Sequence, residues 1–338
     1  MNGTTSAAAQ GARTIAITAA LTAALTAGAL LGLHSTGAAA QGYPTKPVRV
    51  VNNAAGSIND SVTRIVFARV AEALGQQFIV DSRPGAGGNI AATFVAKSPP
   101  DGYTLYLTTQ NVLVINPFLY ANPGFDPLRD FEPVSMVAKI SEVLIAHPSL
   151  GAKSLADFVR LAKAKPGQIS YASAGNGHPQ HLFMDLLQRK TGLKLSHVPY
   201  KGPPQAVLAV VGGETGVMNV GIGLARPHIA SGKLVALAKT GYLASDNLPG
   251  IPALTATYPD TEYVPWLAVF APKGVPGDAV AKLNTAISRA LVVPDVVSRL
   301  KEIDVTTVHS SPGELDKTVR ADMAVNRELV KSLGLKLD

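Results

Sequence analysis

The stretch from Tyr171 to His181 combines residue types that are suited to binding an anion. Gly175 and Gly177 can adopt positive φ angles, so the backbone around them can turn its N–H groups outward. Pro179 fits the first turn of a helix, where its missing N–H costs nothing. Because the first N–H groups of a helix lack partners and carry partial positive charge, the stretch predicts a socket for a carboxylate or phosphate. An ordinary strand-to-helix turn is the alternative.

A second loop near the start of the chain has the same build. Residues 48–51, Val-Arg-Val-Val, predict a strand, and residues 60–74 predict a helix that Asn59 or Asp60 would cap. Gly56 lies in the loop between them. Two such loops, far apart in the sequence, can direct two helix N-termini at one small anion.

Motifs for nucleotide, metal and acyl-transfer chemistry are incomplete in this sequence. Residues 85–90 begin like a dinucleotide-binding fingerprint, but Ile90 stands where glycine or alanine is needed. His178 and His181 have a spacing that could share a metal, yet no further ligand is anchored beside them. We therefore expect no metal, no cofactor and no catalysis. A secreted enzyme that uses His178 or Ser57 is the alternative.

Alternating strand and helix patterns must position the two loops, and they predict an α/β fold. The chain is longer than one core usually fills, so two lobes are expected. The first lobe would comprise residues 41–145 and 264–338, and the second residues 146–263. Each lobe is predicted to be a largely parallel sheet flanked by helices. Such a pair of lobes suits hinge closure around a ligand.

The first forty residues have the features of a secretory signal peptide. They contain one Lys or Arg, Arg13, then an apolar stretch over residues 14–33 and a small-residue end at residues 38–40. This pattern predicts Sec export to the periplasm with cleavage after about Ala40, and a single membrane anchor is the alternative.

The composition narrows the classes of partner. The chain has no cysteine, which excludes disulfides and thiol chemistry. Its formal net charge of +7 comes from scattered bases rather than one block, so nucleic-acid binding is not expected. A mild positive field can still aid the capture of anions.

Short motifs in a fixed order resemble one family, the solute receptors of tripartite tricarboxylate transporters, or Bug family. The resemblance covers essentially the whole mature chain, and the order and spacing of the motifs carry it. The matching stretches are residues 43–47, 83–89, 100–104, 115–117, 130–133, 163–167, 171–177, 197–202 and 227–234, with Trp266, Ala271, Pro272 and Pro276.

The resemblance implies a periplasmic-binding-protein clamshell that captures a small organic carboxylate without catalysis. It also implies delivery to membrane transporter subunits, and we expect a monomer; an orphan receptor that signals to a membrane sensor is an alternative. In the family, loops of both lobes grip the ligand carboxylate, largely through backbone N–H groups and bridging waters. The positions so implied for ligand binding are Ala55, Gly56, Ser57, Asn59, Asp60, Ser173, Ala174, Gly175, Asn176, Gly177, His178, Tyr200 and Asn219.

This sequence departs from the family pattern in ways that bear on the ligand. The first loop usually contains Pro-Phe-x-x-Gly-Gly, whereas residues 52–60 here read Asn-Asn-Ala-Ala-Gly-Ser-Ile-Asn-Asp. An acid that relatives place after a strand of the second lobe is replaced near Asn219, Val220 and Gly221. We therefore expect a neutral far end of the pocket, which favours dicarboxylates or aromatic carboxylates over amino acids.

Overall fold

The computed structural model describes residues 42–338 except 54, 242–247, 262, 335 and 338, so the predicted signal peptide lies outside the described residues. The chain divides into a unit of Met1–Thr45 and a compact unit of Lys46–Asp338. Within the part that the structure describes, no helix is both long and apolar enough to cross a membrane.

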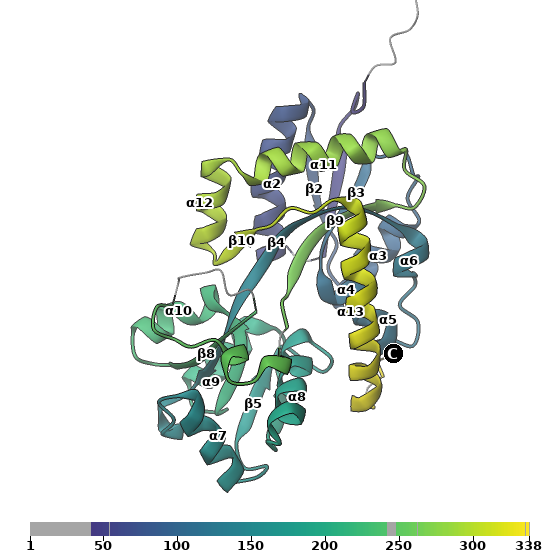
Figure 1. Cartoon of the computed structure of the whole chain (residues 1–338). Helices are drawn as coiled ribbons and strands as arrows, with labels where there is room; N and C mark the ends of the chain where they lie inside the picture. Colours follow the sequence, from purple (N-terminus) through teal and green to yellow (C-terminus); the bar gives the residue numbers. More distant parts are fainter. Residues whose placement is uncertain (1–41, 54, 242–247, 262, 335, 338) are drawn as a thin grey trace, which may run out of the picture. The chain divides into compact units, whose positions relative to one another are not determined.

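Two β-sheets share one long strand, β4, which crosses the middle of Figure 1. The first sheet has the order β2-β1-β3-β9-β4, with β10 on the other side of β4. Its strands are β1 (Val48–Asn52), β2 (Phe78–Ser82), β3 (Thr104–Thr109), β4 (Phe131–Ala146), β9 (Trp266–Pro272) and β10 (Val305–Thr307). The second sheet continues from β4 and adds β5 (Ser170–Ser173), β6 (Ser196–Pro199), β7 (Val217–Gly221) and β8 (Val235–Gly241).

The strand β4 changes sheets within its length. Residues up to Ile140 pair with β9 and β10, and residues from Ser141 onward pair with β7 and β8. Parallel pairs join β1 to β2 and β3, and β5 to β6 and β7, while every pairing of β4 and β9 is antiparallel. The prediction of largely parallel sheets is therefore wrong for the strands in the middle, β4 and β9. These two strands run in opposite directions, and each pairs antiparallel with its neighbours. The predicted α/β class with flanking helices is confirmed.

Helices cover both sheets (Figure 1). Those on the first sheet are α2 (Ile58–Leu74), α3 (Asn89–Ala96), α4 (Gln110–Val114), α5 (Asn116–Leu119), α6 (Pro127–Asp130), α11 (Gly277–Leu291), α12 (Pro294–Glu302) and α13 (Pro312–Leu333). Those on the second are α7 (Leu155–Ala164), α8 (Pro179–Thr191), α9 (Pro203–Val211) and α10 (Ile222–Ala230). Short 3₁₀ turns occur at Ala86–Gly88, Pro148–Leu150, Leu254–Ala256 and Pro259–Thr261.

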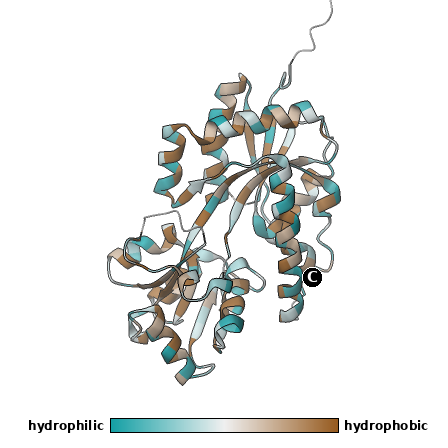
Figure 2. Ribbon diagram, viewed as in Figure 1, coloured by the Kyte–Doolittle hydropathy of each residue, from teal (hydrophilic) through white to brown (hydrophobic). Residues whose placement is uncertain are grey.

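Apolar strand and helix faces form one core cluster on the first sheet and two on the second. Figure 2 shows the apolar residues gathered on the strands and on the helix faces that meet them. Leu182 of α8 is fully buried in the first-sheet cluster, beside Leu119 and Trp266. The start of α8 is therefore packed against the first sheet's core, although the rest of that helix belongs to the second.

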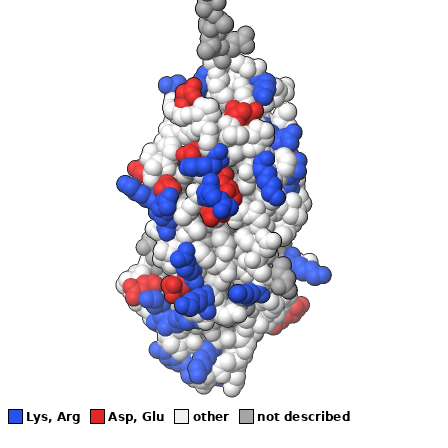
Figure 3. Space-filling model, turned by 90° about the vertical axis from the view of Figure 1, so that its right-hand side faces the viewer, with Lys and Arg blue, Asp and Glu red and all other residues white. Residues whose placement is uncertain are grey.

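Charge is mixed over the surface. Figure 3 shows Lys and Arg interspersed with Asp and Glu on one face, and neighbours such as Arg189 and Asp185 form ion pairs. Surface pairs of this kind contribute little to stability.

Candidate functional site

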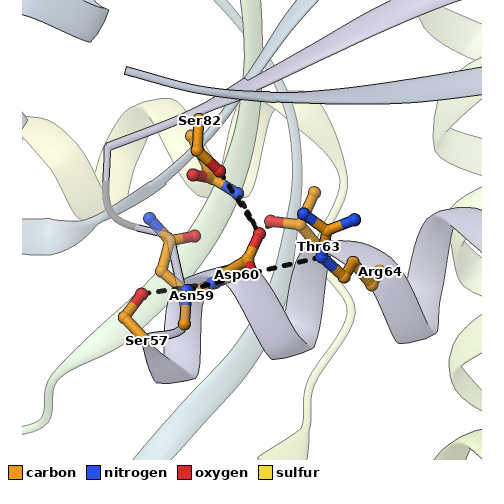
Figure 4. Close-up of polar contacts among 8 residues, drawn as sticks. Ser57, Asn59, Asp60, Thr63, Arg64 and Ser82 are labelled. Carbon is orange, nitrogen blue, oxygen red and sulfur yellow. Dashed lines mark hydrogen bonds and ion pairs between the residues drawn. The ribbon is translucent and has the colours of Figure 1, made fainter. Parts of the chain in front are cut away.

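The loop after β1 starts helix α2 with Ser57 as its N-cap. The Ser57 hydroxyl accepts a hydrogen bond from the N–H of Asp60 at 3.2 Å, as Figure 4 shows. Asn59 and Asp60, the predicted caps, lie inside the first turn, so that prediction is wrong. Gly56, just before the cap, has φ 68°, a left-handed conformation that glycine adopts without strain.

Asp60 holds this loop together from its inner side (Figure 4). Its carboxylate accepts from Asn52 Nδ2 at 3.0 Å, Gly56 N at 3.1 Å, Arg64 Nε at 3.1 Å and Ser82 Oγ at 3.4 Å. Burial alone would raise the pKa of Asp60, but the hydrogen bonds from Arg64, Gly56 and Asn52 outweigh it and hold the pKa below its ordinary value. Asp60 therefore orders the loop as a buried anion.

The loop between β5 and α8 uses its N–H groups internally. The N–H of Ala174 donates to Gln180 Oε1, that of Gly175 to Ser173 Oγ, that of Gly177 to His181 Nδ1 and that of His178 to the Gly175 carbonyl, at 3.1–3.2 Å. We predicted that Gly175 and Gly177 would offer these groups to a carboxylate. In this structure both donors have partners within the loop and its helix, so their offer to a carboxylate stays a prediction.

A cavity of about 670 Å³ lies between the two loops, a size typical of small-molecule sites. Its walls come from both sheets. They comprise the β1–α2 loop, residues 85, 87 and 88, the start of α4, residues 140 and 142 of β4, the start of α8, and residues 203, 204, 220, 221, 224, 263, 265 and 266. The predicted site residues that line it are Ala55, Gly56, Ser57, Asn59 and His178. The predicted residues that do not are Asp60, Ser173, Ala174, Gly175, Asn176, Gly177, Tyr200 and Asn219.

Four helices of at least nine residues begin at this cavity. Ser57 and Ile58 open α2, His178 and Pro179 open α8, Pro203 opens α9, and Gly221 precedes α10. Each helix N-terminus carries about half a positive charge. No Lys or Arg is among the described residues that line the cavity. The site therefore offers a carboxylate dipoles rather than a full positive charge.

Ser57 and His178 line the cavity as helix caps. The ring nitrogen Nδ1 of His178 accepts a hydrogen bond from the Gln180 N–H at 3.4 Å, and burial lowers the pKa of His178 to about 4, so its ring is neutral. A serine–histidine pair does exist elsewhere: Ser173 Oγ lies 2.6 Å from His197 Nε2. Ser173 is fully buried and outside the cavity, so this pair holds β5 to β6.

Glu142 is the cavity residue that sequence reasoning missed. It lies on β4, is 7% exposed, and its Oε2 accepts from Asn219 Nδ2 at 2.7 Å. Asn219 is fully buried and also accepts from Thr240 Oγ1, at 2.7 Å. The prediction of a neutral far end of the pocket is therefore wrong, because Asn219 holds the carboxyl group of Glu142 at the cavity wall. The sequence feature that could have identified Glu142 is its position as a single acid directly before the apolar run of residues 143–146.

A second polar group on the wall combines Gln110, Trp266 and Asp322. Asp322 of α13 accepts from Gln110 Nε2 at 2.9 Å and from Trp266 Nε1 at 2.7 Å. Three buried cavity atoms have no hydrogen-bond partner: Gln110 Oε1, Asn59 Oδ1 and the Tyr263 hydroxyl. Buried polar atoms normally have partners, so these three could accept or donate hydrogen bonds to a ligand or water in the cavity.

A larger hollow of about 1180 Å³ lies beside β1 and α3, away from both loops. Of the charged residues that line it, Lys46 pairs with Asp101, and Arg49 pairs with Asp81 outside the lining. Ile79 and Ile90, which also line it, are about half exposed. We prefer the smaller cavity as the site, because buried unpartnered polar atoms and helix N-termini face it.

Gly177 contacts the first sheet's helices rather than a free surface. A Cβ atom there would lie 2.2 Å from Leu119 Cδ2, and φ is +70°. We expect Gly177→Ala to destabilise the protein by about 2 kcal/mol or more, measured by denaturant unfolding. In the double variant with Leu119→Ala the loss should be smaller than the sum of the two single losses. Strict additivity would show that the contact is absent in solution.

Comparisons with known proteins all indicate one family of receptors. Residues 62–335 match the family described as "Tripartite tricarboxylate transporter family receptor". Protein BugT of Bordetella pertussis is 32% identical over 302 residues, covering 88% of this chain and 93% of that protein.

Two solved structures from Rhodopseudomonas palustris share the fold. Rpa4515 with adipate has a TM-score of 0.77 at 31% identity and covers 87% of this chain and 99% of its own. MatC with bound malate has a TM-score of 0.72 at 30% identity and covers 85% of this chain and 100% of its own. Both bound molecules are dicarboxylates.

Proposed function

Because this chain belongs to the receptor family of tripartite tricarboxylate transporters, we propose that it captures a small organic carboxylate in the cavity and delivers it to transporter subunits of that type. It would act outside the cytoplasm after Sec export and cleavage near Ala40. The family and its fold neighbours are binding proteins rather than enzymes.

The convergence of four helix N-termini on one cavity is the observation that carries this proposal. Each dipole stabilises an anion by roughly 0.3–1 kcal/mol, and each hydrogen bond to a charged group adds about 1.5–3 kcal/mol. Several such contacts support micromolar binding, about −8 kcal/mol, after the cost of association. The adipate and malate held by Rpa4515 and MatC support a carboxylate ligand in particular.

The two sheets supply the lobes that would close on the ligand. We assign residues 41–145 and 264–338 to one lobe and residues 146–263 to the other, with β4 among the crossovers. The cavity takes its walls from both, so ligand should hold them together. A radius of gyration that does not fall on saturation with ligand, measured by small-angle scattering, would contradict closure from an open state.

The single tryptophan provides a direct assay of binding. Trp266 lines the cavity and is 2% exposed, so a ligand beside it should change its fluorescence. We expect saturable changes when mono-, di- and tricarboxylates are titrated, with dissociation constants of about micromolar for the best ligand. The same ligand should raise the midpoint of thermal unfolding, because it binds only the folded state.

Trp266→Phe identifies the source of the signal, since the change in tryptophan fluorescence should vanish, and calorimetry measures how much binding the variant retains. If no carboxylate raises the unfolding midpoint of the wild-type protein, the proposed function is wrong. Conversion of a bound carboxylate to a new product would favour the enzyme alternative.

A further inference from the structure

Glu142 is a buried acid with one oxygen uncommitted. Its Oε2 accepts from Asn219, and this is the one hydrogen bond that the described residues give the side chain. No Lys or Arg lines the cavity around it within the described chain. A buried carboxylate is costly unless it is paired and hydrogen-bonded, so a donor or cation that enters the cavity would stabilise the ionised form of Glu142.

Two other acceptors lie on the same wall. Gln110 is 5% exposed, and its amide orientation is set by Asp322, a carboxylate that accepts from Nε2. The Gln110 Oε1 atom is therefore an acceptor, and it has no partner. The Tyr263 hydroxyl is also unpartnered, and Tyr263 lines the same cavity as Glu142 and Gln110.

The fold holds this acceptor cluster in place. Glu142 lies opposite Gly221 in the β4–β7 register, and Ile140 N donates to the Pro265 carbonyl at 2.9 Å, which fixes β4 beside the segment that carries Tyr263. Asn219 is locked in turn by Thr240. A second carboxylate on the ligand would meet the Glu142 and Gln110 oxygens, whereas an ammonium brings three N–H donors.

We propose that Glu142, Gln110 and Tyr263 form a subsite for an ammonium group, so that the ligand is a small carboxylate with an amino group at its other end. The ligand's carboxylate would lie at the starts of α2 and α8. This inference rests on the proposed function and names the ligand class of the same cavity. It reverses the selectivity expected from the sequence, because that expectation assumed a neutral wall.

The test compares ligands of equal length at pH 7.5. The pairs are succinate and 4-aminobutanoate, glutarate and 5-aminopentanoate, and adipate and 6-aminohexanoate, titrated by calorimetry against the wild-type protein. We expect the amino acid of the best-fitting pair to bind about tenfold tighter or more than its dicarboxylate, the effect of one charge-assisted hydrogen bond.

The variant Glu142→Gln then isolates the subsite. Its carbonyl can keep the hydrogen bond from Asn219, while its NH₂ can donate to a carboxylate, so the preference should fall or reverse toward the dicarboxylate. Glu132→Gln, on the same strand and outside the cavity, should leave the preference unchanged.

The outcomes separate the two proposals. If the wild-type protein binds the dicarboxylate more tightly, the proposal of an ammonium subsite is wrong, while the proposed function as a carboxylate receptor still holds. An amino acid preference that survives in folded Glu142→Gln also overturns it. Failure of every carboxylate tested overturns the proposed function itself.

Discussion

Replacing Glu142 by Gln is expected to stabilise the ligand-free protein at pH 8 by up to about 3 kcal/mol. Burial is the main reason that the pKa of Glu142 is raised from 4.5 to about 7, and the hydrogen bond from Asn219 only partly offsets it. The difference between those pKa values corresponds to about 3 kcal/mol. Glutamine carries no charge, so the variant avoids that cost.

The pH dependence of the effect has a definite sign. Below pH 4.5 Glu142 is protonated in both folded and unfolded chains, so it adds no pH dependence there. Between pH 4.5 and about 7 the unfolded chain releases this proton and the folded chain retains it, so wild-type stability falls as pH rises. The gain from Glu142→Gln should therefore be small at pH 4.5 and complete above pH 7.

Denaturant unfolding of both proteins at pH 4.5, 6 and 8 measures this difference. Glu132→Gln is the matched control, because Glu132 lies on the same strand but pairs with Lys273 at 2.8 Å. It should show no gain at pH 8. Equal stability of wild type and Glu142→Gln at every pH would mean that Glu142 is not a buried, poorly compensated acid in solution.

The gain in stability and the loss of selectivity would have one cause. A binding site retains groups that are unsatisfied in the empty protein, because the ligand satisfies them, and stability is lost in exchange. Gln110 Oε1 and the Tyr263 hydroxyl belong to the same class. A stabilised variant with weakened ligand preference would be the signature of such a site.

The sequence was sufficient to predict the α/β class and the strand–loop–helix arrangement at each of the two loops. Local signals were strong where a cap or turn fixes the backbone, as at Ser311, whose capping box with Glu314 begins α13. They were weak for residues 116–133, where prolines interrupt any helical period and the helices α5 and α6 are only four residues long. The strand β10 was missed because its three residues are too few to show a period.

The candidate site was harder to predict because its walls are assembled by tertiary contacts. Glu142, Gln110 and Tyr263 are far apart in the sequence and meet only because β4 crosses both sheets. The loop at residues 173–178 was recognised correctly as a strand-to-helix connection, but its N–H partners depend on Gln180 and His181. Residue types alone do not reveal whether a donor is already satisfied.

The loop before α2 leads to the second large effect. Asp60→Ala should lower the free energy of unfolding by roughly 2–4 kcal/mol, because it removes the carboxylate that accepts hydrogen bonds from the buried Asn52 Nδ2 and from the Gly56 N–H. It should also abolish carboxylate binding, although Asp60 lies outside the cavity, since Gly56 and Ser57 would lose their fixed positions.

The chain contains a matched control with the same local sequence pattern. Ser154 and Asp157 at the start of α7 repeat the Ser-x-x-Asp arrangement of Ser57 and Asp60, and Ser154 caps its helix in the same way. The side chain of Asp157 is 33% exposed, against 10% for Asp60, and Asp157 is not among the residues that line the cavity. Asp157→Ala should therefore cost much less stability and leave binding unchanged.

Denaturant unfolding and ligand titration of the two alanine variants decide between two roles for Asp60. If Asp60 acts only through a favourable interaction of its charge with the helix dipole, both variants will lose similar, small amounts of stability and both will bind the carboxylate. If it organises the loop through four hydrogen bonds, only Asp60→Ala will lose binding while remaining folded. Because those bonds join β1, the loop, α2 and β2, we expect the second result.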